Sequence, residues 1–167
     1  ETYPKRWNKQ VFPFKKICTC ANCGSGVTAE IQYRVLKSTK VNTHIYYHCC
    51  KSKDMDCREP YITEQELISQ LISFLPQMKL DKRYLIRELN DEIKRVSNMR
   101  KIIEDNDYNG KELTPHKGNE KIKTTDKMIR NYLLHILQFG TPQERVRILN
   151  GIKSRFELRN RRLIINE

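Results

Sequence analysis

Cysteine supplies the clearest chemistry in this 167-residue chain, because all six of its cysteines lie in one short segment. They form two clusters about 25 residues apart: Cys18, Cys20 and Cys23, then Cys49, Cys50 and Cys57. Thiolates are preferred ligands of zinc, and a Cys-x-x-Cys turn places two of them on one tight loop. The spacing therefore predicts a structural zinc ribbon in the N-terminal third of the chain.

We expect the Zn²⁺ ligands to be Cys20, Cys23, Cys49 and Cys57. Within the first cluster, only Cys20 and Cys23 have the two-residue gap of a metal-binding turn, and Gly24 after them favours that turn. In the second cluster, Cys49 and Cys50 compete for one position. Cys49 is favoured because it lies on the same strand face as Tyr47.

Other residues of the segment have alternative interpretations. Cys18 precedes the turn and is expected to pack as a small apolar group. Two histidines, His44 and His48, are alternative ligands, but we expect them to be ordinary strand residues on the surface of the ribbon. A disulfide scaffold is disfavoured because no cysteine follows Cys57, so disulfides would leave most of the chain unconnected. Clustered cysteines fit a metal site in a reducing compartment better.

The charge of the chain favours a polyanionic partner. Lys and Arg number 32 against 20 Asp and Glu, a net charge of +12. Residues 1–60 hold 11 basic and 5 acidic side chains, net +6, and residues 141–167 hold 7 and 3, net +4. Nucleic acid is the usual partner of such a surface. Mean hydropathy is −0.74, and no apolar run approaches the ~18–20 residues of a membrane span, so we expect no membrane partner.

Basic side chains interleaved with the cysteines, and those near the C-terminus, are the candidate DNA contacts. They are Lys15, Lys16, Arg34, Lys37, Lys40, Lys51, Lys53, Arg159, Arg161 and Arg162. Contacts with phosphate position a protein on DNA, whereas contacts with base edges specify sequence. The sequence alone does not divide the ten residues between these two roles.

The expected fold class is α+β: a small zinc β-ribbon, long helices with a coiled-coil-like insertion, then a short helix and a β-hairpin. We expect a linker at 1–13, the zinc ribbon at 14–62 and a helix packing on it at 63–80. A coiled-coil-like insertion with a flexible tip is expected at 81–130, and C-terminal helices and a hairpin completing the zinc domain at 131–167. The expected ribbon strands are 14–18, 27–35 and 44–49.

Helix boundaries are marked by local signals. A Thr-x-x-Glu capping box at 63–66 starts one helix, Pro76 ends it, and a second such box at 141–144 has proline in its first turn. Between them, apolar residues recur with heptad spacing, which predicts a coiled-coil-like stripe. These residues are Ile86, Leu89, Ile93, Val96 and Ile103.

The order of several segments resembles a known family. The segments are 12–17 (FPFKKI), 20–28 (CANCGSGVT), 46–57 (YYHC and the last cysteine), 60–67 (PYITEQEL) and 139–165, which begins FGTPQER. In this order they resemble the C-terminal zinc-ribbon region of large serine recombinases, the integrases and transposases of phages and mobile elements. The resemblance covers about 100 residues at the two ends of the chain.

This resemblance implies a bipartite zinc domain that binds a half-site of a duplex DNA attachment site. It also implies a coiled coil that mediates contacts between subunits, and a cytoplasmic, nucleoid-associated bacterial protein. The family's catalytic serine lies near a Tyr-x-Arg-Val-Ser motif, whereas residues 33–36 (YRVL) lack the serine. We therefore expect the DNA-binding part of a longer recombinase, without catalysis of its own.

Two other functions compete with DNA binding. In one, the zinc site only clips the fold together, and helices at 82–104 and 126–138 capture a partner protein. In the other, the chain is a zinc hydrolase, which needs an open coordination position and a nearby general base. Four thiolate ligands leave no such position, which argues against the hydrolase.

Overall fold

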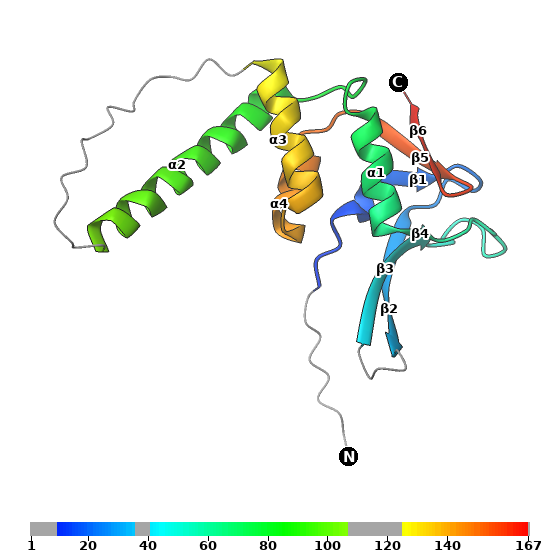
Figure 1. The fold of residues 1–167 in the computed structure, drawn as a ribbon. Coiled ribbons are helices and arrows are strands. Elements are labelled where there is room, and N and C mark those ends of the chain that lie inside the picture. Colours follow the sequence, from blue (N-terminus) through cyan, green and yellow to red (C-terminus); the bar gives the residue numbers. More distant parts are fainter. Residues whose placement is uncertain (1–9, 36–40, 107–124, 167) are drawn as a thin grey trace.

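The computed structural model describes residues 10–35, 41–106 and 125–166, and the chain is α+β (Figure 1). The described residues form four α-helices, one 3₁₀ helix and two three-stranded sheets. In chain order the elements are η1 (Pro13–Lys16), β1 (Cys18–Cys20), β2 (Val27–Val35), β3 (Val41–Cys49), β4 (Ile62–Thr63), α1 (Glu64–Phe74), α2 (Lys82–Asn106), α3 (Asp126–Phe139), α4 (Pro142–Leu149), β5 (Arg155–Arg159) and β6 (Arg162–Asn166).

One sheet is built on a long antiparallel hairpin, in the order β2-β3-β4. Val27 pairs with Cys49 at the base of the hairpin, and Tyr47 pairs with Ile62 of β4. Only this base is packed, since Val27 and Tyr47 are buried whereas Tyr33 near the tip is 68% exposed. The single buried face expected along all of 27–35 is therefore limited to the base of the hairpin.

The other sheet joins the two ends of the chain. Its order is β1-β5-β6, with β1 parallel to β5 and Cys18 paired with Phe156. The strand expected at 14–18 instead begins at Cys18, and the residues before it form η1. Proline explains this difference, because Pro13 fixes φ near the helical value at the first position of η1 and lacks an amide donor.

The helices begin where the local signals predict. Thr63 accepts from the amide of Glu66, and the Glu66 carboxylate accepts from the amide of Thr63, which completes a capping box. Thr141 and Glu144 repeat this arrangement at the start of α4. Each box satisfies amides that the first helical turn leaves free.

One hydrophobic core connects all these elements. Its buried side chains come from both sheets, from α1 and from α3, and include Phe14, Leu71, Leu133, Leu137 and Phe156. Helix α1 contacts β3, β6 and α3, so it lies between the two sheets and the helical layer (Figure 1). A second small cluster consists of Cys20, Cys49 and Cys57, with Cys23 packed against it.

Helix α2 is packed along only part of its length. Leu85 is buried against the core, and Ile86 and Leu89 are half-buried. Further along, Ile93 and Val96 are 38% and 43% exposed, because no described element covers them. The side chain of Ile103 and the expected flexible tip lie outside the described residues. None of the described helices is both long enough and apolar enough to cross a bilayer.

Candidate metal centre and basic surface

Four cysteine sulfurs lie together beside the end of β1. Each of the Sγ atoms of Cys20, Cys23, Cys49 and Cys57 is within 4.8 Å of the other three. The Cys20 and Cys57 sulfurs are 3.7 Å apart, and those of Cys23 and Cys49 are 3.4 Å apart. These are the four cysteines that the sequence indicates as ligands.

The sulfur positions fit a tetrahedral metal site. With metal–sulfur bonds of about 2.3 Å, the edges of a tetrahedron of sulfurs are about 3.8 Å long. The Cys20–Cys57 and Cys23–Cys49 separations, 3.7 and 3.4 Å, are close to that edge. The donor set is four thiols, so the site favours a soft or borderline cation.

A tight turn presents the first pair of cysteines. The amide of Gly24 donates to the carbonyl of Cys20, and the amide of Cys20 donates to the carbonyl of Ser25. Gly24 has a φ of +68°, in the left-handed region that glycine adopts without steric cost. The glycine after the second cysteine therefore allows the chain to fold back and aim both thiols in one direction.

The second pair comes from two different places. Cys49 is the last residue of β3, and Cys57 lies in the loop that leads to β4. The amide of Lys51 donates to Cys49 Sγ at 3.3 Å, a bond that favours a negatively charged sulfur. Lys51 has a φ of +56°, so the loop adopts a sterically unfavourable conformation that brings its amide to the sulfur.

The thiols differ in their proton affinity. Burial raises the pKa of Cys20, and burial raises the pKa of Cys49 to about 12. The hydroxyl of Ser25, 3.1 Å from Cys23 Sγ, lowers the pKa of Cys23 to about 6. A cation among the sulfurs offsets the unfavourable burial of thiolate charge.

The alternative ligands lie elsewhere. Cys18 is buried in the main core, where burial raises its pKa to about 12, and Cys50 is exposed. His48 stacks on Tyr61 with ring centroids 4.4 Å apart. His44 is exposed on the outer part of the β2–β3 hairpin. None of the four belongs to the sulfur cluster.

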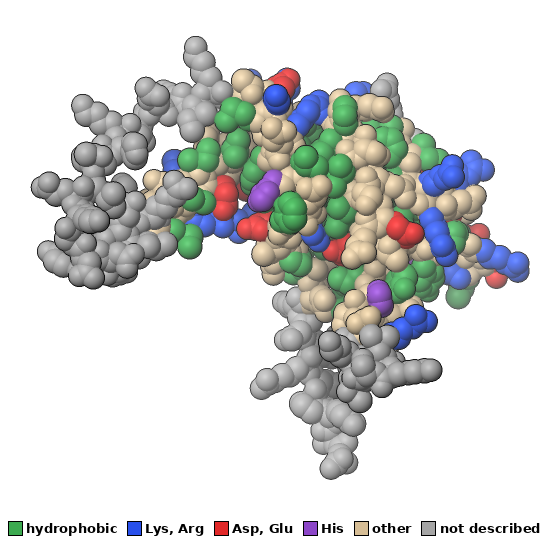
Figure 2. All heavy atoms as spheres, viewed as in Figure 1, with side chains coloured by type: hydrophobic (Ala, Val, Ile, Leu, Met, Phe, Trp, Pro, Cys, Tyr) green, Lys and Arg blue, Asp and Glu red, His purple; other side chains and the backbone are tan. Residues whose placement is uncertain are grey.

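Several predicted DNA contacts lie in loops beside the metal centre. The backbone of Lys51 bonds to Cys49, and the amide of Lys53 bonds to the Ser25 hydroxyl at 2.9 Å. Nearby, Arg159, Arg161 and Arg162 occupy the β5–β6 turn, where all three are exposed. In Figure 2, Lys and Arg side chains gather along the edge where Figure 1 places this hairpin and the β3–β4 loop.

The structure does not bring all the predicted basic residues together. Arg34 lies near the tip of the β2–β3 hairpin, seven residues and about 23 Å of strand from Val27 at its base. Lys15 lies on η1, with its ammonium 5.3 Å from the centre of the Phe12 ring. Lys37, Lys40 and the side chain of Lys16 lie outside the described residues.

A buried carboxylate that sequence analysis missed connects the metal-binding turn to the arginine-rich turn. Glu59 is 5% exposed, and it accepts from Asn22 Nδ2 at 2.7 Å and from the amide of Arg161 at 3.2 Å. Asn22 lies between Cys20 and Cys23. No periodic pattern marks Glu59, since its partner Arg161 is 102 residues away.

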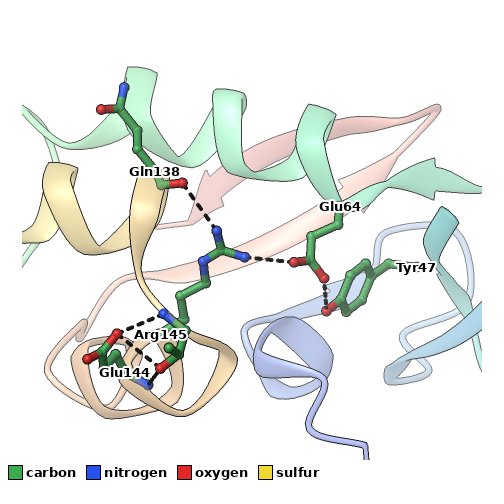
Figure 3. A network of polar contacts seen from close by, with 6 residues as sticks. Tyr47, Glu64, Gln138, Glu144 and Arg145 are labelled. Carbon is green, nitrogen blue, oxygen red and sulfur yellow. Dashed lines mark hydrogen bonds and ion pairs between the residues drawn. The ribbon is translucent and has the colours of Figure 1, made fainter. Parts of the chain in front are cut away.

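A second polar network that sequence analysis missed stabilises the interior (Figure 3). Arg145 Nη1 pairs with Glu64 Oε1 at 2.8 Å, and the Tyr47 hydroxyl donates to Glu64 Oε2 at 3.0 Å. Arg145 also donates to the carbonyl of Gln138 at 3.4 Å. Burial raises the pKa of Tyr47, and the network joins β3, α1, α3 and α4.

Comparison of the chain with family models, curated proteins and solved structures found no match.

Proposed function

We propose that this chain is the C-terminal DNA-binding region of a large serine recombinase, folded around Zn²⁺ and binding a half-site of a duplex attachment site. The observation that carries the proposal is the position of the basic loops. The Lys51 amide bonds to Cys49, and the Lys53 amide bonds to Ser25, whose hydroxyl contacts Cys23. Glu59 connects the arginine-rich β5–β6 turn to Asn22, which lies between Cys20 and Cys23. A metal that orders the cysteines therefore orders a basic surface as well.

Zinc is the metal that best suits the donor set. Four thiolates at tetrahedral separations are typical of structural zinc, which supplies folding free energy to small domains. Four protein ligands leave no position for water or substrate, so we assign the site no catalysis. The net charge of +12 adds a long-range attraction for the phosphate backbone.

The test is fluorescence anisotropy of the chain with a labelled duplex of mixed sequence, in a salt series, with and without a strong zinc chelator. We expect affinity to fall steeply as salt rises, because phosphate contacts release counterions. We expect chelation to abolish the binding, because the basic loops depend on the cysteine cluster. Binding that is absent at low salt, or indifferent to chelation, would contradict the proposal.

A second candidate function is protein binding through α2, in which the metal site serves only as a clip. Its support is the apolar stripe of α2, where Ile93, Val96 and Met99 are 38%, 43% and 57% exposed. The simplest partner for this stripe is a second copy of the same chain. Sedimentation of the chain and of an Ile93→Ser, Val96→Ser variant separates it from DNA binding, since the variant should then lose self-association.

A further inference from the structure

The turn between β5 and β6 has a backbone that its sequence does not favour. Its two central residues, Asn160 and Arg161, have φ values of +50° and +62°. Two-residue hairpin turns commonly use positive φ at both positions, and Asn-Gly is the preferred sequence. Asparagine tolerates this conformation, but arginine is strained in it. The chain therefore keeps an arginine at a position where glycine would be more favourable for folding.

The same turn concentrates positive charge. Arg159 and Arg162 pair directly across the hairpin, and both are exposed. Like charges in directly opposed positions destabilise a hairpin. Within the described residues, no ion pair involves either of them or Arg161. An anionic partner would relieve the repulsion between these arginines, which destabilises the turn in the free protein.

Two polar side chains, the buried Glu59 and the partly exposed Gln70, hold the backbone of this turn in place. Glu59 accepts from the amide of Arg161, and Gln70 Nε2 donates to the Arg161 carbonyl at 2.7 Å. Gln70 Oε1 also accepts from the amide of Leu163 at 2.7 Å. Because backbone groups make these bonds, the arginine side chains remain available to a ligand.

Glu59 extends this support to the metal centre. Its second carboxylate oxygen accepts from Asn22, inside the Cys20–Cys23 turn, and no described cation pairs with it. Burying a carboxylate costs free energy, which its hydrogen bonds to Asn22 and Arg161 offset only in part. Here it fixes the distance between the metal-binding turn and the arginine-rich turn.

We propose that the Arg159–Arg162 turn is a preorganised contact for duplex DNA, with Arg161 as a contact residue and Glu59 as its positioning residue. This inference rests on the proposed DNA-binding function. The strained backbone fixes Arg161 at the apex of the hairpin, so less side-chain and loop freedom is lost when DNA binds.

The first test is Arg161→Gly, which removes the side chain and relieves the strain. We expect the melting temperature to rise by about 2–4 °C. In a chain of this size, that shift corresponds to a small increase in the free energy of unfolding. Affinity for the mixed-sequence duplex should fall at least tenfold, and the salt dependence should weaken by about one phosphate contact. Arg83→Gln, at an exposed position of α2, removes the same charge and should change affinity less than twofold.

The outcomes separate the two proposals. If the unaltered chain does not bind the duplex, the DNA-binding function fails and this inference fails with it. If the unaltered chain binds and the Arg161→Gly variant binds equally well, the inference alone is overturned. A melting temperature that falls in this variant would also overturn it, because Arg161 would then be stabilising the turn.

Glu59 is tested with Glu59→Gln, alone and combined with Arg161→Gly. Each carboxylate oxygen of Glu59 accepts one of the two bonds, and in the variant an NH2 group replaces one oxygen and faces a donor. We therefore expect a several-fold loss of affinity with unchanged metal content. Added to Arg161→Gly, the substitution should cause little further loss, since both act through one contact. Loss of bound metal, or a full additional loss of affinity in the double variant, would overturn the positioning role.

Discussion

At the scale of single residues, competition with protons governs how firmly the cysteines hold a cation. Burial raises the pKa of Cys20 and of Cys49, the latter to about 12, so both are protonated near neutral pH in the metal-free cluster. A metal must displace these protons, because only thiolates coordinate it. Metal affinity is therefore coupled to pH.

We expect the apparent zinc affinity to rise by about 100-fold per pH unit between pH 6 and 8, since at least two protons are released. The direction follows from the raised pKa values: acid keeps the thiols protonated and weakens binding. Competition with a colorimetric chelator at three pH values measures this slope. A slope below tenfold per unit would mean that the buried thiols are ionised before the metal binds.

The partly buried ion pair of Arg145 and Glu64 gives a second prediction at this scale. Their side chains are 13% and 14% exposed, so Arg145→Met leaves the Glu64 carboxylate largely shielded from water and without its cation. We expect a loss of about 3–5 kcal/mol in the free energy of unfolding, measured with urea. Lys82→Met, which breaks the exposed pair with Asp126, is the matched control and should cost less than about 1 kcal/mol.

The sequence predicts the residues of the site where the signal is local. Cys20, Cys23 and Gly24 form one turn, so their spacing alone indicates their geometry. Glu59 and Arg145 could not be found in this way, because their partners lie 102 and 81 residues away and no period connects them. In the sequence these two residues look like ordinary surface charges, because only the folded chain brings their partners to them.

At the scale of elements, helix ends are well predicted and their packing is not. Thr63 and Thr141 mark the starts of α1 and α4. Each cap is a local contact, in which the threonine side chain accepts from the amide three residues later. Whether an apolar stripe is covered depends on distant segments. The heptad stripe of α2 is half-buried at Ile86 and Leu89 and exposed at Ile93 and Val96, a difference that periodicity does not reveal.

The end of α3 gives a prediction at this scale. A Cβ at Gly140 would lie 2.5 Å from the carbonyl oxygen of Ile136, a backbone atom that cannot rotate away. We expect Gly140→Ala to cost about 1–3 kcal/mol, as overpacked positions do. Gly26→Ala is the control, because its Cβ would lie 3.9 Å from Cys50 Sγ, which is ordinary van der Waals contact. Thermal unfolding of both variants measures the difference.

At the scale of the whole molecule, segments far apart in the sequence share one sheet and one hydrophobic core. Strand β1 pairs with β5, and Phe156, Leu158 and Leu163 belong to the same core as Phe14 and Leu71. The α+β class follows from local patterns, but this parallel pairing does not. No short-range signal specifies which strand lies beside β1.

A chain shortened to residues 1–154 tests whether the cysteine segment needs β5 and β6 in order to fold. It retains all four cysteine ligands and loses β5 and β6. We expect a large loss of zinc affinity together with loss of cooperative unfolding, because the turn that carries Cys20 loses its neighbouring strand. Zinc content and far-ultraviolet circular dichroism measure both properties against the full chain. Undiminished zinc affinity would show that the cysteine segment folds independently.

The pairing of β1 with β5 also has a consequence for synthesis of the protein in the cell. Cys20 pairs with Leu158, a separation of 158 − 20 = 138 residues. At translation rates of roughly 5–20 residues per second, the ribosome needs about 7 to 28 seconds to supply the partner strand. Throughout that interval β1 lacks β5, its parallel partner. If the cysteine segment needs β5 to fold, which the shortened chain tests, its thiols stay open to oxidants and competing metals for those seconds.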